Sequence, residues 1–243
     1  MTFFAYQDSE SFYGEPEPAP GEHVQFVPEK LFAHRQRGTE HPLERRLHRD
    51  EGLVVHEVAT DVLAWPSSLW RVDDLEKPIR LRPGNRWMRC RAFTVVEQAP
   101  AWLIAGPHGD AVEWVITQAR MLTDAQVDAL ASLPDEGESS LTRALWAGWT
   151  RKHRGSGSPV GCGLTTLNEA VTEAAHQRGP RLFGRDEQDE VEVLSDPAWL
   201  RASHAAHAAA LGLGAPELLT PQENAVLTRR WITVFGIPDL PER

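Results

Sequence analysis

The stretch Trp87–Val96, WMRCRAFTVV, has the clearest β-strand pattern in the chain. Successive side chains of a strand point to opposite faces of a sheet, so residues two apart share a face. One face would carry Met88, Cys90, Ala92, Thr94 and Val96. The opposite face would carry Trp87, Arg89, Arg91, Phe93 and Val95. The pattern predicts one continuous strand in a sheet formed by the first half of the chain.

Weaker strand signals lie on both sides of this stretch. β-Branched and apolar residues begin at Leu53, and turn-forming residues then divide the chain at Pro66, Pro78 and 83–85. The apolar run 101–105 predicts a further strand, which ends at the turn 106–109. We therefore expect a small, mainly antiparallel sheet in the N-terminal half.

The chain beyond residue 109 carries several helix-start signals. Asp110 stands three residues before Glu113, which predicts a helix capped by Asp110. Three threonines with Gln or Glu three positions later fit the capping box, namely Thr123, Thr166 and Thr220, and Asp196-Pro197 fits an N-cap followed by a first-turn proline. Gly212 and Gly236 are expected to end helices. The predicted helices lie near 124–133, 140–153, 167–178, 197–211 and 221–235.

These elements predict an α+β fold with a helical C-terminal half of about five helices. We expect three regions: an acidic arm over 1–29, a sheet-containing α+β region over 30–121, and a helical region over 122–243. The last two regions are compatible with one continuous globular unit. The arm has six carboxylates, several prolines and aromatic residues, and no Lys or Arg. It is interpreted either as a partly ordered segment packed by its aromatic residues or as a peptide that docks on a partner.

The chain is acidic on average, with 25 Lys and Arg against 35 Asp and Glu, a formal net charge of −10. This average argues against a generally basic nucleic-acid-binding protein. No apolar run approaches the roughly 18 residues of a membrane span, and no signal peptide is expected. Two cysteines, Cys90 and Cys162, cannot form a disulfide framework, so we expect a cytoplasmic location. The nine tryptophans are explained most simply as core residues.

Residues 77–91, here called the basic segment, depart from this average. The segment has no acidic residue and six cations, namely Lys77, Arg80, Arg82, Arg86, Arg89 and Arg91. The rest of the chain therefore has 19 basic and 35 acidic residues, a charge of −16. Arg80 and Arg82 are two residues apart, as are Arg89 and Arg91, and a turn at 83–85 would bring both pairs onto one face.

Two interpretations of the basic segment remain open. The favoured one is that its arginines pair with the chain's own carboxylates, including those of the N-terminal arm, because the protein is acidic overall. The other is an anion-binding face on which guanidinium groups hold phosphates and Trp87 stacks on a base or sugar. The residues of that face would be Arg80, Arg82, Arg86, Arg89, Arg91 and Trp87.

Catalytic residues cannot be assigned, because no recognised catalytic motif occurs in the chain. Two weak candidates remain. His108 lies in the predicted strand-to-helix turn but lacks a visible nucleophile partner. Cys162 lies in the glycine-rich stretch 155–163, just before the predicted Thr166 cap, where a helix N-terminus would lower the pKa of a thiol. A flexible linker with an ordinary thiol is the favoured interpretation of that stretch.

Two histidine motifs are weak candidates for metal ligands. His204 and His207 share a helical face with Leu200 and Leu211, which is expected to point inward. The Glu-x-x-His pair Glu173–His176 is expected on the solvent side of its helix. Buried imidazoles with ordinary partners are favoured over ligation, so neither a metal nor a cofactor is predicted.

The leading functional hypothesis is a cytoplasmic binding or regulatory protein that uses the basic segment as its interaction surface. The expected partner is an unknown protein or a second copy of the chain, and a local nucleic-acid contact is also compatible. A membrane partner is not expected. The alternative is an enzyme or ligand-binding protein for a small anionic molecule, using Arg80, Arg82, Arg89, Arg91, Trp87 and His108. The sequence leaves open whether the protein is an enzyme.

Overall fold

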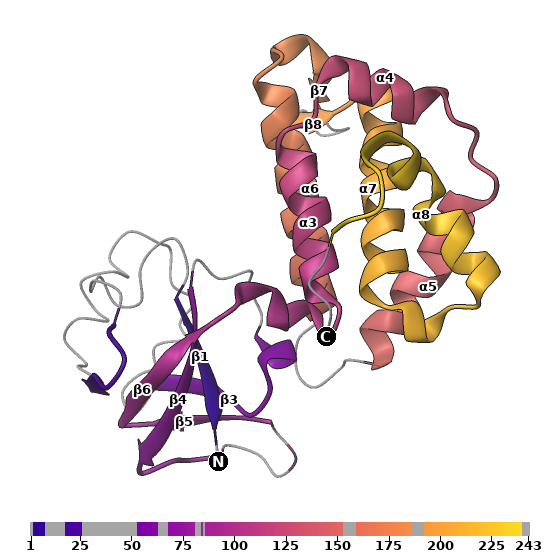
Figure 1. Cartoon of the computed structure of the whole chain (residues 1–243). Coiled ribbons are helices and arrows are strands. Elements are labelled where there is room, and N and C mark those ends of the chain that lie inside the picture. The colour runs from indigo at the N-terminus through magenta and orange to yellow at the C-terminus, as the bar shows by residue number, and fades with distance from the viewer. Residues whose placement is uncertain are drawn as a thin grey trace. The chain divides into compact units, whose positions relative to one another are not determined.

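The computed structural model describes residues 2–7, 18–25, 53–62, 68–80, 84, 86–152, 159–185 and 192–239. For residues 7, 146–152, 159–165, 185 and 192 only the backbone is described. The described residues divide into two compact units, a sheet unit up to residue 104 and a helical unit from residue 105 on. The described residues form a six-stranded antiparallel sheet in the first unit and six α-helices in the second, which confirms the predicted α+β class (Figure 1).

The sheet is ordered β2-β6-β4-β1-β3-β5, and every described pair of neighbours is antiparallel. Its strands are β1 (Phe3–Gln7), β2 (His23–Gln25), β3 (Leu53–His56), β4 (Ser68–Glu76), β5 (Trp87–Cys90) and β6 (Ala92–Ala99). Strand β1 therefore lies inside the sheet, between β4 and β3, and β2 pairs with β6. Parts of the acidic arm thus belong to the sheet, and the aromatic ring of Phe3 is in its core.

The continuous strand predicted over 87–96 is wrong, because the chain bends at Arg91 and forms two strands. Strand β5 pairs with β3, whereas β6 pairs with β4, near the other end of the strand order. Ile79, just after β4, exchanges two backbone hydrogen bonds with Arg89 of β5, at N–O distances of 2.7 and 3.0 Å. Strands β4, β1, β3 and β5 are neighbours in that order, and the Ile79–Arg89 bridge joins the chain after β4 back to β5. The sheet is therefore curled and has an inner and an outer face.

The inner face holds the core of the sheet unit, which consists of Phe3, Ala5, Leu53, Val55, Trp70, Val72, Met88, Cys90, Phe93 and Val95. The predicted alternation is correct for Met88 and Cys90 but wrong beyond Arg91, where Phe93 and Val95 are buried and Val96 is exposed. The bend at Arg91 shifts the alternation by one residue, which the local sequence pattern does not show.

A second apolar cluster includes residues of β1, β4 and β6 on the outer face, and consists of Ala59, Val62, Leu69, Ala99 and Ile104 with Phe4, Tyr6 and Leu103 at its margin. Two short 3₁₀ helices contribute to it, η1 (Ala59–Asp61) and η2 (Ala101–Ala105). The strand predicted over 101–105 is therefore wrong, since a short apolar run is compatible with either a strand or a helical turn.

The helical unit is built around α7 (Pro197–Gly214), which packs against all five other described α-helices (Figure 1). These are α3 (Gly109–Arg120), α4 (Asp124–Ser132), α5 (Glu138–Lys152), α6 (Pro159–His176) and α8 (Pro221–Phe235). The buried face of α7 is rich in alanine, with Ala202, Ala205, Ala206, Ala208, Ala209 and Ala210. Small side chains allow the surrounding helices to approach its axis closely.

Most of the predicted helix ends are confirmed. Thr123 and Thr220 form complete capping boxes, and the Asp196 carboxylate accepts hydrogen bonds from the N–H groups of two first-turn residues. Gly236 ends α8 with a φ of +79°. Asp110 is not the N-cap of α3, because the helix begins at Gly109, two residues earlier than predicted, and His108 takes the N-cap position.

Two predicted boundaries are wrong. Thr166 lies inside α6, which begins at Pro159, a residue whose fixed φ suits the first helical turn. Gly212 lies inside α7, where a Cβ atom would meet Thr228 Cγ2 of α8 at 2.5 Å. This glycine therefore permits a close helix–helix approach rather than a helix stop.

Short elements complete the helical unit. The 3₁₀ helix η3 (Pro180–Leu182) leads into a two-stranded hairpin of β7 (Phe183–Arg185) and β8 (Glu192–Leu194). A further 3₁₀ helix, η4 (Pro216–Leu218), joins α7 to α8. Among the helices that the structure describes, none is long and apolar enough to cross a membrane.

Candidate anion-binding site

The basic segment begins where β4 ends, and its residues 77–80 run antiparallel to β5. The Ile79–Arg89 bridge places these two residues directly opposite each other. Since Met88 and Cys90 are on the inner face, Arg89 and Trp87 belong to the outer face of β5. Arg80 follows Ile79 by one residue, so the register does not place it with Arg89. The predicted common face of the two arginine pairs therefore does not form as expected, and Arg82 lies outside the described residues.

Arg80 and Arg86 are held by carboxylates that follow β3. Arg80 Nη2 pairs with Glu57 Oε1, and Arg86 Nη2 donates to Asp61 Oδ1 at 2.6 Å. The Asp61 side chain is only 1% exposed, so Arg86 compensates a buried negative charge. For these two arginines, the structure agrees with the interpretation that the basic segment pairs with the chain's own carboxylates.

The basic segment has three further described cations, Lys77, Arg89 and Arg91. The Arg89 guanidinium carbon lies over the Trp87 ring, 5.9 Å from its centroid, at the outer limit of a cation–π contact. Lys77 directly follows β4, Arg91 lies at the bend between β5 and β6, and both are exposed. Ile79 is 56% exposed and adds apolar surface beside Arg89. We call Lys77, Ile79, Trp87, Arg89 and Arg91 the outer cationic face.

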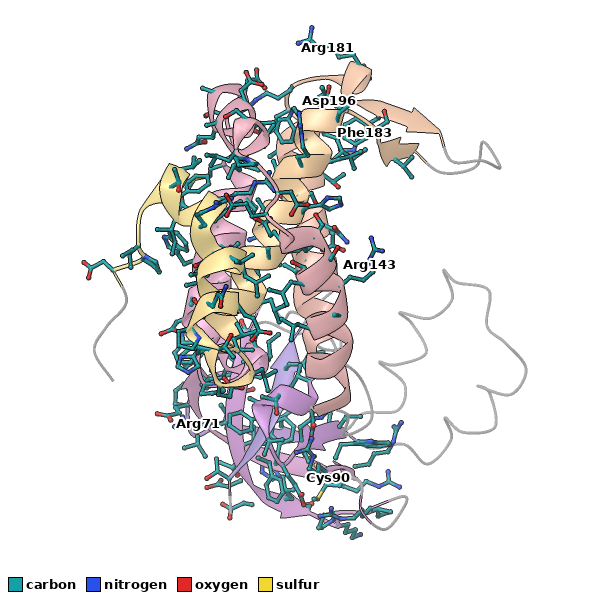
Figure 2. All side chains as sticks on the ribbon, turned by 90° about the vertical axis from the view of Figure 1, so that its right-hand side faces the viewer. Arg71, Cys90, Arg143, Arg181, Phe183 and Asp196 are labelled. Atoms are coloured by element: carbon teal, nitrogen blue, oxygen red, sulfur yellow. The ribbon has the colours of Figure 1, made fainter. Side chains whose placement is uncertain are left out.

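A row of cross-strand neighbours reaches this face across the outer side of the sheet. It runs in the order Glu97, Arg71, Phe4, His56 and Trp87. Arg71 Nη1 and Glu97 Oε1 form an ion pair of 2.6 Å at one end of the row. Figure 2 labels Arg71 of this outer row and the Cys90 thiol of the inner face.

His56 is the residue of this row that the sequence interpretation missed. Its side chain is 4% exposed, and neither ring nitrogen has a hydrogen-bond partner among the described residues. The centroid of the Tyr6 ring lies 6.0 Å from that of the imidazole. Burial lowers the pKa of His56 to about 4, so the ring is neutral at physiological pH. The sequence signal that could have identified His56 is its place as a lone histidine on one side of a predicted strand whose other side is apolar.

Both weak catalytic candidates belong to the helical unit. His108 is half-buried at the N-cap of α3 and belongs to the helical unit, whereas the arginines belong to the sheet unit. The backbone of Cys162 is part of α6, and its side chain lies outside the described atoms. Burial raises the pKa of the Cys90 thiol to about 11, so this cysteine is a poor nucleophile.

The predicted inward position of His204 is wrong, because His204 and Leu200 are both exposed on α7. The alanines of α7 form its buried face instead, and His207 is half-buried. Glu173 and His176 are exposed as predicted, and the His176 ring stacks on Phe183 with a centroid distance of 4.1 Å. Within the described parts of the chain, no three His, Cys, Asp or Glu side chains are grouped as metal ligands.

Comparisons of the chain with protein-family models, curated proteins and solved structures found no match. The class of protein is therefore defined by its own fold: an α+β protein with a curled antiparallel sheet and a bundle of helices around an alanine-rich central helix. The feature of the sheet unit that points to a ligand is the outer cationic face with its neighbour His56.

Proposed function

We propose that this chain is a binding protein that holds an anionic partner on the outer cationic face of its sheet unit. The observation that carries the proposal is the Ile79–Arg89 register, which places Arg89 and Trp87 opposite the core and beside exposed apolar surface. A cytoplasmic location is part of the proposal and is supported by the use of only two cysteines, one of them a buried free thiol.

The ion pairs of Arg80 and Arg86 limit what these two side chains add to the positive charge of the face. Glu57 and Asp61 neutralise Arg80 and Arg86, so those two side chains contribute little net charge. Arg91 follows Arg89 by two residues, at the bend where β5 ends, so their Cα atoms are at most about 7 Å apart. Guanidinium groups at such a spacing can each form paired hydrogen bonds with successive phosphates or carboxylates.

The test is the binding of two labelled anionic polymers, a single-stranded oligonucleotide and an acidic peptide, at increasing salt. We expect at least one of them to bind, with an affinity that falls steeply as salt rises. The double variant Arg89→Glu/Arg91→Glu should weaken binding by tenfold or more. It should also lower the slope of log K against log salt by about 1 for each phosphate that the protein no longer neutralises.

The matched control is Arg143→Glu/Arg181→Glu, which changes the net charge equally on two exposed arginines of the helical unit (Figure 2). These substitutions should leave the affinity within about twofold, since neither arginine belongs to the outer cationic face. Equal decreases in affinity for both double variants, or no binding of either polymer at low salt, would contradict the proposed function.

A further inference from the structure

We infer that the outer cationic face recognises a nucleotide unit, with its base stacked on Trp87, its phosphate on Arg89 and Arg91, and the edge of the base read by His56. This inference rests on the proposed function and names the chemistry of the ligand.

The position of Trp87 favours a flat ligand. Trp87 is half-buried on β5, and the guanidinium of Arg89 lies 5.9 Å from its ring centroid. A tryptophan beside an arginine offers a stacking surface and a phosphate-binding group within one nucleotide of each other. The carboxylates of an acidic peptide would pair with the cations of this face, but they would not stack on the indole ring.

His56 supplies a second and independent observation. It is the direct cross-strand neighbour of Trp87, and it is buried with both ring nitrogens unpartnered among the described residues. A neutral imidazole has one N–H donor and one acceptor nitrogen. A ligand that forms hydrogen bonds with both nitrogens must therefore offer an acceptor and a donor. The edge of a nucleobase offers both, whereas an ionised carboxylate offers acceptors only.

The ring nitrogens of His56 have almost no solvent contact. A base can therefore reach them only if neighbouring side chains rotate, and the centroid of the Tyr6 ring lies 6.0 Å from that of the imidazole. Side-chain rotation of this kind is common when interfaces form. The inference thus predicts that His56 becomes hydrogen-bonded only in the complex.

Lys77 and Arg91 extend the positive charge beyond Arg89 and are both exposed. A chain with successive phosphates would reach them, whereas a mononucleotide would reach only part of this surface. The same nucleotide chemistry is available from a free nucleotide or from a single strand, so the experiment has to separate these two sources.

The experiment measures the affinity of the full chain for three probes by fluorescence anisotropy and competition. The probes are oligothymidylate of roughly ten nucleotides, within the usual span of single-strand sites, an abasic strand of equal length, and thymidine monophosphate. We expect the abasic strand to bind at least tenfold more weakly than oligothymidylate, because it keeps the phosphates and lacks the bases. Equal binding of thymidine monophosphate and oligothymidylate would assign the site to a free nucleotide and would still support nucleotide recognition.

Variants test the assigned roles of the two side chains. Trp87→Leu should weaken oligothymidylate binding by about tenfold or more, whereas Trp87→Phe should keep most of the affinity because phenylalanine also stacks. His56→Phe should weaken binding of oligothymidylate by about tenfold and leave binding of the abasic strand unchanged. The thermal unfolding of each variant shows whether it is folded.

The failures of the two proposals can be distinguished. Equal affinity for the abasic strand and oligothymidylate would overturn nucleotide recognition, while the anionic face would stand. Tighter binding of an acidic peptide than of oligothymidylate would also overturn it and would assign the face to a protein partner. Absence of binding by all of these probes would overturn both proposals.

Discussion

Arg230 of α8 is a buried arginine that joins several helices of the helical unit. It is 2% exposed and donates hydrogen bonds to the carbonyl of Leu130, at 2.6 and 3.1 Å, and to that of Arg201, at 3.1 Å. Its Nη1 also pairs with Oε1 of the buried Glu138, at 3.1 Å. One guanidinium group thus connects α8 with α4, α5 and α7. A buried ion pair adds little net stability when intact, but removal of one partner is costly because the other charge stays buried.

This asymmetry predicts the effect of removing the cation. Arg230→Met should lower the free energy of unfolding by about 3–5 kcal/mol at a pH near 8, because the Glu138 carboxylate is left without its partner. The double variant Arg230→Met/Glu138→Gln should recover a large part of this stability, since no buried charge remains. Urea denaturation of the two single variants and the double variant measures the coupling energy. A double variant whose destabilisation equals the sum of the two single effects would contradict the coupling.

Glu138 also predicts a dependence of stability on pH. Burial raises the pKa of Glu138 to about 7, Arg230 opposes this rise and Asp135 adds to it. The folded protein therefore holds this proton more tightly than the unfolded chain between a pH of about 4.5 and 7, and the free energy of unfolding decreases as pH rises through that range. The contribution is on the order of 3 kcal/mol.

The measurement is the difference in unfolding free energy between wild type and Glu138→Gln at several pH values, which cancels the titration of other groups. The wild type should lose stability relative to this variant as pH rises from about 5 to 8. The matched control is Glu136→Gln, an exposed residue that pairs with Arg229 on the surface. A flat difference for Glu138→Gln, or an equal slope for both variants, would contradict this prediction.

At the scale of helices and strands, the features that the sequence predicts correctly are those with a signal in a few neighbouring residues. Thr123 and Thr220 satisfy their own helix ends within four residues, so their caps can be recognised without knowledge of the fold. Thr166 has the same spacing to Glu169 but lies inside α6, because a capping motif is only used where the chain before it is not already helical.

Features that depend on distant pairing were not predicted. The bend at Arg91 exists because β5 pairs with β3 and β6 pairs with β4, and neither partner is visible in residues 87–96. The same pairing sets the Ile79–Arg89 register, which separates Arg80 from Arg89. The sequence therefore indicated which segment is basic, but not which of its arginines share a face, and it offered no reason to join His56 to Trp87.

The contact between α7 and α8 predicts that Gly212 cannot gain a side chain without cost. A Cβ at this position would lie 2.5 Å from Thr228 Cγ2 and 3.2 Å from Leu227 Cβ. Gly212→Ala should lower the free energy of unfolding by about 1–3 kcal/mol through overpacking, although alanine favours helix by about 1 kcal/mol.

Thr228→Ser is the matched second change, because it removes Cγ2 and keeps the hydroxyl that donates to the Asn224 carbonyl at 2.9 Å. The double variant Gly212→Ala/Thr228→Ser should recover most of the wild-type stability, as measured by thermal and urea unfolding. A Gly212→Ala variant at least as stable as the wild type would show that the two helices separate without cost.

At the scale of the whole molecule, each unit has a hydrophobic core of its own. Leu53 is fully buried in the core of the sheet unit, and Leu211 is fully buried on the central helix of the helical unit. The sheet unit depends on residues at the start of the chain, because β1 separates β4 from β3. Separate cores in one chain are the usual basis of separate cooperative unfolding units.

This organisation predicts that a substitution that destabilises one core lowers the stability of its own unit and not that of the other. Leu53→Ala and Leu211→Ala should each cost about 2–5 kcal/mol, because each leaves a cavity among fully buried neighbours. Native-state hydrogen exchange, read peptide by peptide, should show faster exchange in the strands for Leu53→Ala and in α7 and its neighbours for Leu211→Ala. The two substitutions serve as controls for each other, since both remove the same atoms from a buried leucine. Equal acceleration throughout the chain in both variants would mean that the two units unfold together, and the outer cationic face would then depend on the stability of the helices as well as on its own sheet.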